Sequence, residues 1–312
     1  MEDATRTTPL RSKQARRWII LLCIPISLAA YFALRPPQWR AVDFIRLSRY
    51  WTGLFSRLAA LPDRAEAALL RGGVIAFQPV TISLRNGVRM TVDPTDLIGH
   101  ELILRGEWEK EESYWIDASL RPGDTFVDVG AHHGTYSLRA AQLVGLTGQV
   151  IAIEPNPPSL QRLRQNIQLN AFSNIAVAPV ACGVREGKLT LYESSPSNTG
   201  MASLSASNAG GSGAVIASHQ VDIVPLDQVI EKLAPQRRIG LIKVDTEGAE
   251  TIVLAGALRT IARHRPAIIV EVVAELLVNM NSSVSELEGL LHQAGYRKAQ
   301  SSRTNALWKP RP

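Results

Sequence analysis

The sequence has little cysteine, few aromatic residues and few charges for its length. Two cysteines among 312 residues, Cys23 and Cys182, exclude a disulfide framework and a cysteine-rich zinc module. Aromatic residues make up 6% of the chain and charged residues 20%, whereas 46% are hydrophobic. This apolar content excludes an intrinsically disordered chain. The length allows one domain of ordinary enzyme size together with additional segments.

The net positive charge of the chain comes from its N-terminal part. The net charge is +6. Residues 1–71 contain 12 Lys and Arg against 5 Asp and Glu, a net of +7, whereas residues 72–312 contain 22 against 23, a net of −1. The larger part is near neutral with scattered basic residues, which argues against nucleic-acid binding. The asymmetry indicates two parts with different roles.

An uncharged run, WIILLCIPISLAAYFAL, spans residues 18–34 after a basic tail at 1–17. As a helix it would be about 25 Å long at about 1.5 Å per residue, the short end of what crosses a bilayer core of about 30 Å. We therefore expect a single-pass transmembrane helix. The alternatives are a cleaved secretory signal, with Ser27 and Ala29 as its small residues, and a buried soluble helix. Basic residues flank both ends, so their balance leaves the orientation open.

The segment 35–71 begins at a Pro-Pro helix breaker and continues as an amphipathic pattern. In its part 41–61, arginines recur at helical spacing on one face, and Trp, Phe and Leu line the other. Such a pattern is typical of a helix on a membrane surface, and a helix packed on the soluble domain is the alternative. The sequence thus predicts contact with a lipid bilayer through residues 18–61.

From residue 72 the pattern becomes that of a soluble α/β domain. Two alternating stretches within 80–93 surround Asn86-Gly87, a strong hairpin signal, and a helical stretch follows as far as residue 120. We treat 72–120 as a hairpin and helical lead-in to a domain at 121–312. The Ser- and Gly-rich stretch 194–219 separates two strands of a second predicted hairpin, and it is either a lid or a disordered insertion.

A glycine turn follows the first buried strand of the domain. Phe126, Val127 and Val129 form a short apolar strand, and Gly130 and Gly134 bracket a turn before a helix. Such a turn lets a ligand approach the backbone at a helix N-terminus. It contains neither the Lys-Ser/Thr of a P-loop nor the GxGxxG pattern, which weakens a nicotinamide interpretation.

An acid ends the second buried strand, where a Rossmann-like fold binds ribose hydroxyls. This residue is Glu154, in VIAIEPNP, 24 residues after Gly130. A carboxylate accepts both hydroxyl hydrogens of a ribose. A further helix and a third strand, NIAVAPVACG (174–183), continue the strand–helix alternation. The order predicts a doubly wound parallel sheet.

Several motifs in this order resemble the FkbM family of S-adenosylmethionine-dependent methyltransferases. They run from about residue 80 to residue 297, and the box at 244–250 is the most distinctive. The motifs are RGEWE (105–109), DVGAHHG (128–134), VIAIEPNP (150–157), NTGMASL (198–204) and VDTEGAE (244–250). The resemblance implies a Rossmann-like class I methyltransferase with a seven-stranded, mostly parallel sheet, and S-adenosylmethionine as cofactor.

The resemblance also implies site residues at matching positions. It places Asp128, Gly130 and Gly134 at the methionine end of the cofactor and Glu154 at the ribose. Cys182 would flank the adenine, and Glu109 would meet the ammonium or sulfonium side. His132 stands where the family usually has Asn, and because imidazole is larger and titratable we expect slightly different cofactor contacts there. We expect no metal, because the adjacent His132 and His133 diverge and no third ligand is evident.

Methyl transfer to a hydroxyl needs a base, and Asp245 and Glu247 are the candidates. They follow the apolar strand 240–244 at the edge of the sheet where ligands bind. The alternative is a capping motif at the start of the next helix.

We expect a membrane-anchored O-methyltransferase acting on a sugar, glycolipid or secondary metabolite, with its domain facing the cytoplasm, where S-adenosylmethionine is made. The alternatives are an inactive membrane-tethered binding protein and a nicotinamide-dependent reductase; the acceptor itself stays open.

Overall fold

A computed structural model describes residues 78–211 and 214–312. The chain divides into two units, residues 1–80 and 81–312, and apart from the first residue of strand β1 all elements below belong to the second. The predicted tail 1–17, transmembrane helix 18–34 and amphipathic segment 35–71 lie outside the described residues. Among the helices that are described, none combines the length and the apolar character needed to cross a bilayer.

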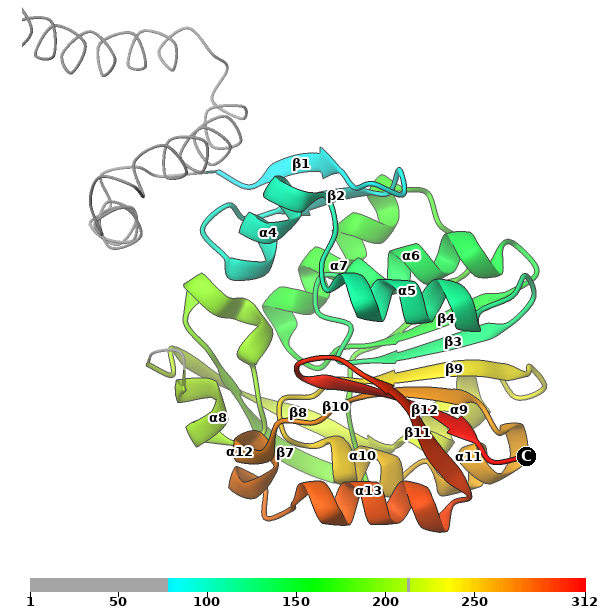
Figure 1. The fold of residues 1–312 in the computed structure, drawn as a ribbon. Coiled ribbons are helices and arrows are strands. Elements are labelled where there is room, and N and C mark those ends of the chain that lie inside the picture. The colour runs from blue at the N-terminus through cyan, green and yellow to red at the C-terminus, as the bar shows by residue number, and fades with distance from the viewer. Residues whose placement is uncertain (1–77, 212–213) are drawn as a thin grey trace, which may run out of the picture. The chain divides into compact units, whose positions relative to one another are not determined.

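One central sheet of seven strands organises the domain, in the order β11-β12-β10-β9-β3-β4-β5 (Figure 1). The five strands that come first in the chain, β3, β4, β5, β9 and β10, run parallel. The last two pair antiparallel, β12 with β10 and β11 with β12. The prediction of a seven-stranded, mostly parallel sheet is confirmed. The strands are β3 (Thr125–Val129), β4 (Gln149–Ile153), β5 (Ile175–Ala178), β9 (Ile239–Val244), β10 (Ala267–Glu271), β11 (Tyr296–Ser301) and β12 (Asn305–Pro310).

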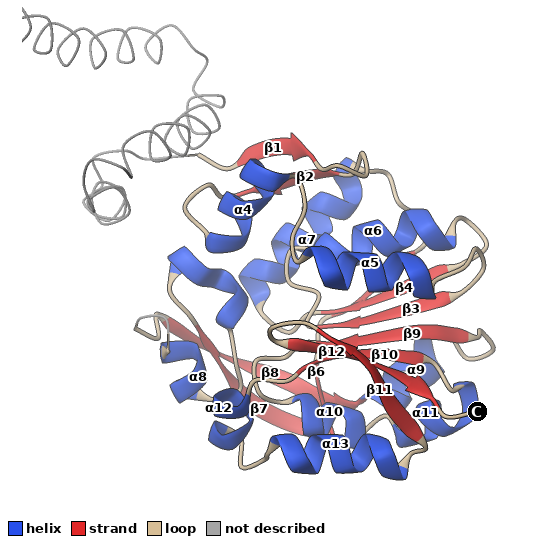
Figure 2. Cartoon of the chain, viewed as in Figure 1, coloured by secondary structure: helices blue, strands red, loops and turns tan. Residues whose placement is uncertain are grey.

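Helices cover both faces of this sheet, because nearly every residue of the inner strands is apolar and buried (Figure 2). Alternate strand residues point to opposite faces. One face packs on α5 (Lys110–Ser119), α6 (Thr135–Val144) and α7 (Pro157–Leu169). The other packs on α9 (Leu226–Leu233), α10 (Glu250–Ala255), α11 (Leu258–His264), α12 (Ala274–Asn279) and α13 (Val284–Gln293).

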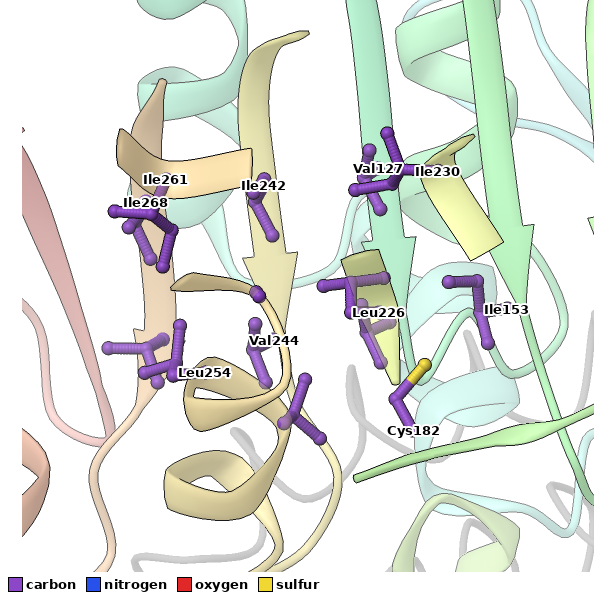
Figure 3. Packing of buried hydrophobic residues seen from close by; sticks show 14 of the residues in the cluster. Val127, Ile153, Cys182, Leu226, Ile230, Ile242, Val244, Leu254, Ile261 and Ile268 are labelled. Atoms are coloured by element: carbon purple, nitrogen blue, oxygen red, sulfur yellow. The ribbon is translucent and has the colours of Figure 1, made fainter. Parts of the chain in front are cut away.

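The larger of the two cores lies on the second face. Figure 3 shows Val127, Ile153, Val244 and Ile268 from four parallel strands facing side chains of the covering helices. Cys182 lies at one end of this cluster and is 3% exposed. Burial raises the pKa of its thiol to about 12, so it behaves as a small apolar side chain.

The predicted N-terminal hairpin is present as β1 (Val80–Ser83) and β2 (Arg89–Val92), followed by α4 (Leu97–Arg105). Two asparagines, Asn166 of α7 and Asn170 at its C-cap, attach it to the domain. Asn166 Oδ1 accepts from the Thr91 N–H at 2.8 Å, and Asn170 exchanges hydrogen bonds with the backbone of Arg89 at 2.7 and 2.9 Å. The Asn166 and Asn170 side chains therefore hold the lead-in on the domain.

The prediction of a single third strand over residues 174–183 is wrong. The stretch 174–183 divides into β5, which ends at Ala178 in the main sheet, and β6 (Ala181–Gly183), which joins a separate three-stranded sheet. Pro179 stands between them, and proline has no N–H for a ladder hydrogen bond. The partners of β6 are β7 (Gly187–Glu193) and β8 (Ala217–Pro225), which form the predicted second hairpin outside the main sheet.

The described part of the 194–219 stretch contains two short helices. These are the 3-10 helix η1 (Pro196–Met201) and α8 (Ala206–Gly210). Ser203 is buried, exchanges backbone hydrogen bonds with Tyr192, and donates its hydroxyl to the Glu247 carbonyl at 2.8 Å. These contacts hold the segment against the carboxyl edge of the central sheet.

Candidate active site

The carboxyl ends of β3 and β9 meet at the glycine turn. Gly130 has φ +85, and a Cβ placed there would lie 1.7 Å from the carbonyl oxygen of Asp245. The N–H of Asp245 in turn bonds the Val129 carbonyl at 3.0 Å. Only glycine fits this contact, so the turn and the 245–249 segment are built against each other.

An inner cavity lies beside this turn, between the ends of β3 and β4 and the three-stranded sheet. Its walls are mostly apolar, and its acids are Glu154, which follows β4, together with Asp245 and Glu247. The apolar lining includes Ile153, Val180, Ala181, Cys182, Leu191 and Leu204. A flat apolar ring with a polar, hydroxyl-bearing attachment suits such a cavity.

Two backbone donors hold the Glu154 carboxylate in place. The His132 N–H donates to Oε2 at 2.7 Å and the Asn156 N–H donates to Oε1 at 2.8 Å. Each oxygen keeps a further lone pair that can accept a ligand hydroxyl. Burial raises the pKa of Glu154 to about 7, because a charged carboxylate loses water there.

His132 connects the glycine turn with the segment that covers the cavity. Its Nε2 lies 2.9 Å from Thr199 Oγ1, and this hydroxyl donates to Asp96 Oδ1 at 2.8 Å. Since the Thr199 proton is given to Asp96, His132 Nε2 must be the donor to Thr199. Burial lowers the pKa of His132, so the neutral ring is favoured. The ring stacks on His133 with 3.6 Å between centroids, so the prediction that these two side chains diverge is wrong.

An outer cavity continues from the inner one toward β10 and α12. The two cavities share five lining residues: Gly130, His132, Gly200, Asp245 and Glu247. The outer cavity is rich in carboxylates and includes the aromatic residues Trp108 and Tyr136. Its acids are Glu109, Asp245, Glu247, Glu271 and Glu275.

A buried lysine compensates several of these acids. Lys243 is 1% exposed, donates to Asp245 Oδ2 at 2.7 Å and lies 4.7 Å from the centroid of the Tyr136 ring. The Tyr136 hydroxyl donates to Glu109 Oε2 at 2.6 Å. Burial and Asp245 raise the pKa of Glu109 to about 7, although Lys243 and Tyr136 oppose the shift.

The capping role in the 245–250 box belongs to Glu250. Its Oε1 accepts from the Thr246 N–H, the Thr246 hydroxyl and the Gly248 N–H at 2.8 to 3.1 Å. The N-cap position of α10 is Ala249, without a side-chain hydrogen bond. Because Glu250 satisfies the turn, Asp245 and Glu247 remain available to the cavities.

Three carboxylates converge at the edge of the outer cavity. Single oxygens of Asp245, Glu247 and Glu271 all lie within 4.8 Å of one another. Burial and the neighbouring acids raise the pKa of both Glu247 and Glu271 well above the usual value. Carboxylates this close are stable together when they share protons or a cation.

The structure distributes the predicted site residues over these cavities. Asp245 and Glu247 lie where the cavities meet, together with Gly130 and His132. Glu154 and Cys182 line the inner cavity, and Glu109 lines the outer one. Asp128 and Gly134 line neither of them: Asp128 accepts from Ser137 Oγ at 2.6 Å beneath the turn, and Gly134 packs against Leu163.

Lys243, Glu271 and Thr199 are site residues that the sequence motifs do not predict. A lysine inside the apolar strand IGLIKV was the available signal for the first, because a buried charge needs a partner. Glu271 ends an apolar strand in the same way as Glu154 and Asp245 do. Nothing local distinguishes Thr199 from the other polar residues of its stretch.

Comparison with known proteins gives the same family as the motifs. A curated relative, Methyltransferase 1 of Beauveria bassiana (strain ARSEF 2860), is 27% identical over 155 residues, 45% of this chain and 61% of that protein. A solved FkbM methyltransferase from Methylobacillus flagellatus KT is 18% identical, with a TM-score of 0.39, covering 68% of this chain and 52% of that one. Aeropyrum pernix fibrillarin, solved with natively bound S-adenosyl-L-methionine, is 11% identical with a TM-score of 0.39, covering 73% and 91%.

The family model itself covers most of the domain. The chain spans about three fifths of the curated relative and about half of the FkbM structure. The model described as "Methyltransferase FkbM domain" matches residues 128–298, more than half of the chain, from the glycine turn to β11. The chain therefore belongs to the FkbM family of methyltransferases.

Proposed function

We propose that this protein transfers the methyl group of S-adenosylmethionine to a hydroxyl group of an acceptor that binds in the outer cavity. Family membership supports the cofactor. The observation that carries the proposal is the junction of the two cavities at Asp245 and Glu247. A cofactor in one cavity and an acceptor in the other would meet beside two carboxylates.

The inner cavity fits S-adenosylmethionine chemically. Glu154 offers two lone pairs for a vicinal diol, and apolar side chains surround the space next to it. The bound cofactor supplies a methyl carbon that its sulfonium activates for displacement. The protein's own contribution is alignment of the acceptor and removal of its proton.

Asp245 and Glu247 remain our candidates for residues that act on the acceptor. Lys243 holds one oxygen of Asp245, which leaves the other for the acceptor hydroxyl. Glu247 is at φ +55, a left-handed conformation that costs free energy in a non-glycine residue. This conformation occurs in the segment that lines both cavities.

The acceptor we propose is a sugar, a glycolipid or another hydroxylated metabolite. The outer cavity combines aromatic surfaces with carboxylates that accept from hydroxyl groups. A nucleic-acid partner is disfavoured because residues 72–312 carry a net charge of only −1.

We also propose that residues 18–61 attach the protein to a membrane. The uncharged run 18–34 and the basic amphipathic pattern after it support this, as does the net charge of +7 over residues 1–71. The domain would face the cytoplasm, where the cofactor is made. Protease protection tests this orientation in sealed vesicles whose cytoplasmic face is on the inside. Digestion of the domain only after the vesicles are opened supports it.

Calorimetry of the full chain with S-adenosylmethionine and with NAD tests the proposed cofactor. We expect binding of S-adenosylmethionine alone, and loss of that binding in Glu154→Ala. Binding of NAD without S-adenosylmethionine would instead support a nicotinamide-dependent reductase.

Methyl transfer is then tested with methyl-tritiated S-adenosylmethionine and extracts of membrane lipids and glycans. We expect label in a hydroxylated product, and Asp245→Asn should bind the cofactor but lose turnover. Cofactor binding without transfer to any fraction would favour a binding protein that retains the fold. Full turnover in Asp245→Asn would show that Asp245 does not act on the acceptor.

A further inference from the structure

We propose that Glu271 is a further catalytic residue, which accepts the proton of the acceptor hydroxyl during methyl transfer in place of Asp245 and Glu247, while those two carboxylates position the acceptor. The inference rests on the proposed function and concerns the acceptor side of the same site. Its evidence is the position of β10 in the sheet, the surroundings of the Glu271 carboxylate and the hydrogen bonds of the neighbouring acids.

The strand order places Glu271 on the acceptor side. β9 lies between β3, which carries the glycine turn, and β10, which ends at Glu271. Val244 pairs with Val270, so the residues that follow them, Asp245 and Glu271, leave adjacent parallel strands at the same level. Glu271 lines the outer cavity and is not part of the inner one.

One oxygen of Glu271 is buried without a hydrogen-bond partner. Among the described residues, Glu271 Oε2 is one of a few buried side-chain oxygens of this kind. A buried carboxylate oxygen without a donor is costly, because it loses water without compensation. A hydroxyl group of a bound acceptor would supply the missing donor.

Three other acids near the outer cavity are engaged differently. Asp245 Oδ2 holds Lys243, Glu250 Oε1 accepts three donors, and Glu109 Oε2 accepts from Tyr136. Each of these oxygens has a fixed partner that a hydroxyl would have to displace. Glu271 Oε2 needs no such displacement.

The charges around Glu271 favour its taking a proton. Asp245, Glu247 and Glu250 face it from the turn after β9 and from α10, and Lys243 is the opposing cation on β9. Burial, followed by these acids, raises its pKa well above the usual value. Glu275, from α12, lines the same cavity. A carboxylate in this environment is a stronger base than an exposed one.

The step balances without another reactant. The acceptor O–H bond breaks and its proton goes to Glu271. The acceptor oxygen forms a C–O bond with the methyl carbon as the C–S bond breaks, and the electron pair of that bond stays on sulfur. A sulfonium and a carboxylate are thereby replaced by a neutral thioether and a carboxylic acid. Water then removes the proton from Glu271.

The test compares Glu271→Gln with Glu231→Gln, an exposed position on α9 remote from both cavities. Full-length proteins are assayed with methyl-tritiated S-adenosylmethionine and a membrane glycolipid and glycan extract across a pH series. Calorimetry gives cofactor affinity. For an acceptor-free readout, infrared spectroscopy follows the carbonyl band of protonated carboxylic acids.

We expect Glu271→Gln to lose about 100-fold or more in turnover, the usual range for a general base, with cofactor affinity within about twofold. At saturating S-adenosylmethionine, where the titration of Glu154 no longer limits binding, the wild-type rate should rise with pH above the usual carboxyl range. This rise should be absent in Glu271→Gln but present in Glu231→Gln. The infrared band that titrates in the wild type over that range should lose the intensity of one carboxyl group in Glu271→Gln and keep it in Glu231→Gln, because Glu109, Glu154 and Glu247 also have raised pKa values.

Three results would overturn the inference. The first is unchanged turnover and pH dependence in Glu271→Gln. The second is a loss of cofactor affinity in Glu271→Gln as large as its loss of turnover. The third is wild-type turnover that chelation abolishes and magnesium restores, which would make the cluster a cation site. A wild-type protein that binds no S-adenosylmethionine, or methylates nothing, would overturn the proposed function as well, so the two failures are distinguishable.

Discussion

At the scale of single residues, Lys243 is the buried cation on which the neighbouring carboxylates depend. Burial opposes its charged form, but Asp245, Asp128 and Glu109 outweigh that effect and raise the pKa of Lys243 above its ordinary value. It lies beside Asp128 in the register of β3 and β9. One buried cation therefore compensates acids of β3, the 245–249 segment and the outer cavity.

Replacing this cation by Lys243→Met should destabilise the fold by about 3–5 kcal/mol, because it leaves buried carboxylates uncompensated. Chemical denaturation of the purified chain measures the loss. Adding Asp245→Asn should recover part of it. Lys232→Met, at an exposed position on α9, serves as the control and should change stability by less than about 0.5 kcal/mol.

Glu154 gives a pH dependence of cofactor binding. Because burial raises its pKa to about 7, the ionised form that accepts two hydroxyls is lost as pH falls. We expect S-adenosylmethionine affinity to fall by about tenfold from pH 8 to pH 6, as for one titrating group. Calorimetry at both values checks this, and a profile that Glu154→Gln leaves unaltered would contradict it.

At the scale of elements, the contact between the glycine turn and the end of β9 builds the site. Gly130 and Asp245 belong to turns more than a hundred residues apart, and the backbone of one touches the backbone of the other. β3 and β9 are neighbours in the sheet, so the contact is imposed by strand order. Both cavities depend on it, since both residues line each of them.

Gly130→Ala should therefore separate the two turns and abolish cofactor binding. The added Cβ meets a carbonyl oxygen at 1.7 Å, and φ +85 strains any L residue. Gly289→Ala on α13 is the matched control: nothing lies within 4 Å of its Cβ, and we expect stabilisation of up to about 1 kcal/mol. Thermal unfolding and calorimetry measure both. Wild-type binding by Gly130→Ala would contradict the packing argument.

At the scale of the whole molecule, charge separates a basic N-terminal part from a near-neutral domain. The net charge of +6 is the sum of +7 in residues 1–71 and −1 in the remainder. Attraction to anionic lipids weakens with salt, whereas an inserted apolar helix resists it. Salt therefore distinguishes surface attachment from a membrane anchor.

We expect the full chain to float with anionic lipid vesicles and to stay bound after a wash in 1 M salt, at which the screening length is about 3 Å. Ile24→Arg with Leu28→Arg should release it, because each arginine costs about 2.5–3.5 kcal/mol at a helix centre. Complete release of the unmodified chain by salt would instead support a surface-bound amphipathic helix.

Much of the fold follows from local patterns. The apolar runs ending at Val129, Ile153 and Val244 are each too short for a helix and are bounded by turn residues, and they predict strands of a parallel sheet. The separate three-stranded sheet was not predicted. The sequence pattern assigns β6 to the main sheet, because nothing local shows that the residues after Pro179 pair with β8 instead.

What the sequence by itself determined is the order of strands and helices, the glycine turn, and the acids at the ends of β4 and β9. These depend on side-chain periodicity and on residues close together in the chain. The tertiary structure alone decided that Lys243 holds Asp245, that Glu109 lines the outer cavity, and that Glu271 stands beside Asp245. The last pair is 26 residues apart and adjacent only because β9 and β10 align in register, and such long-range pairing leaves no local pattern in the sequence.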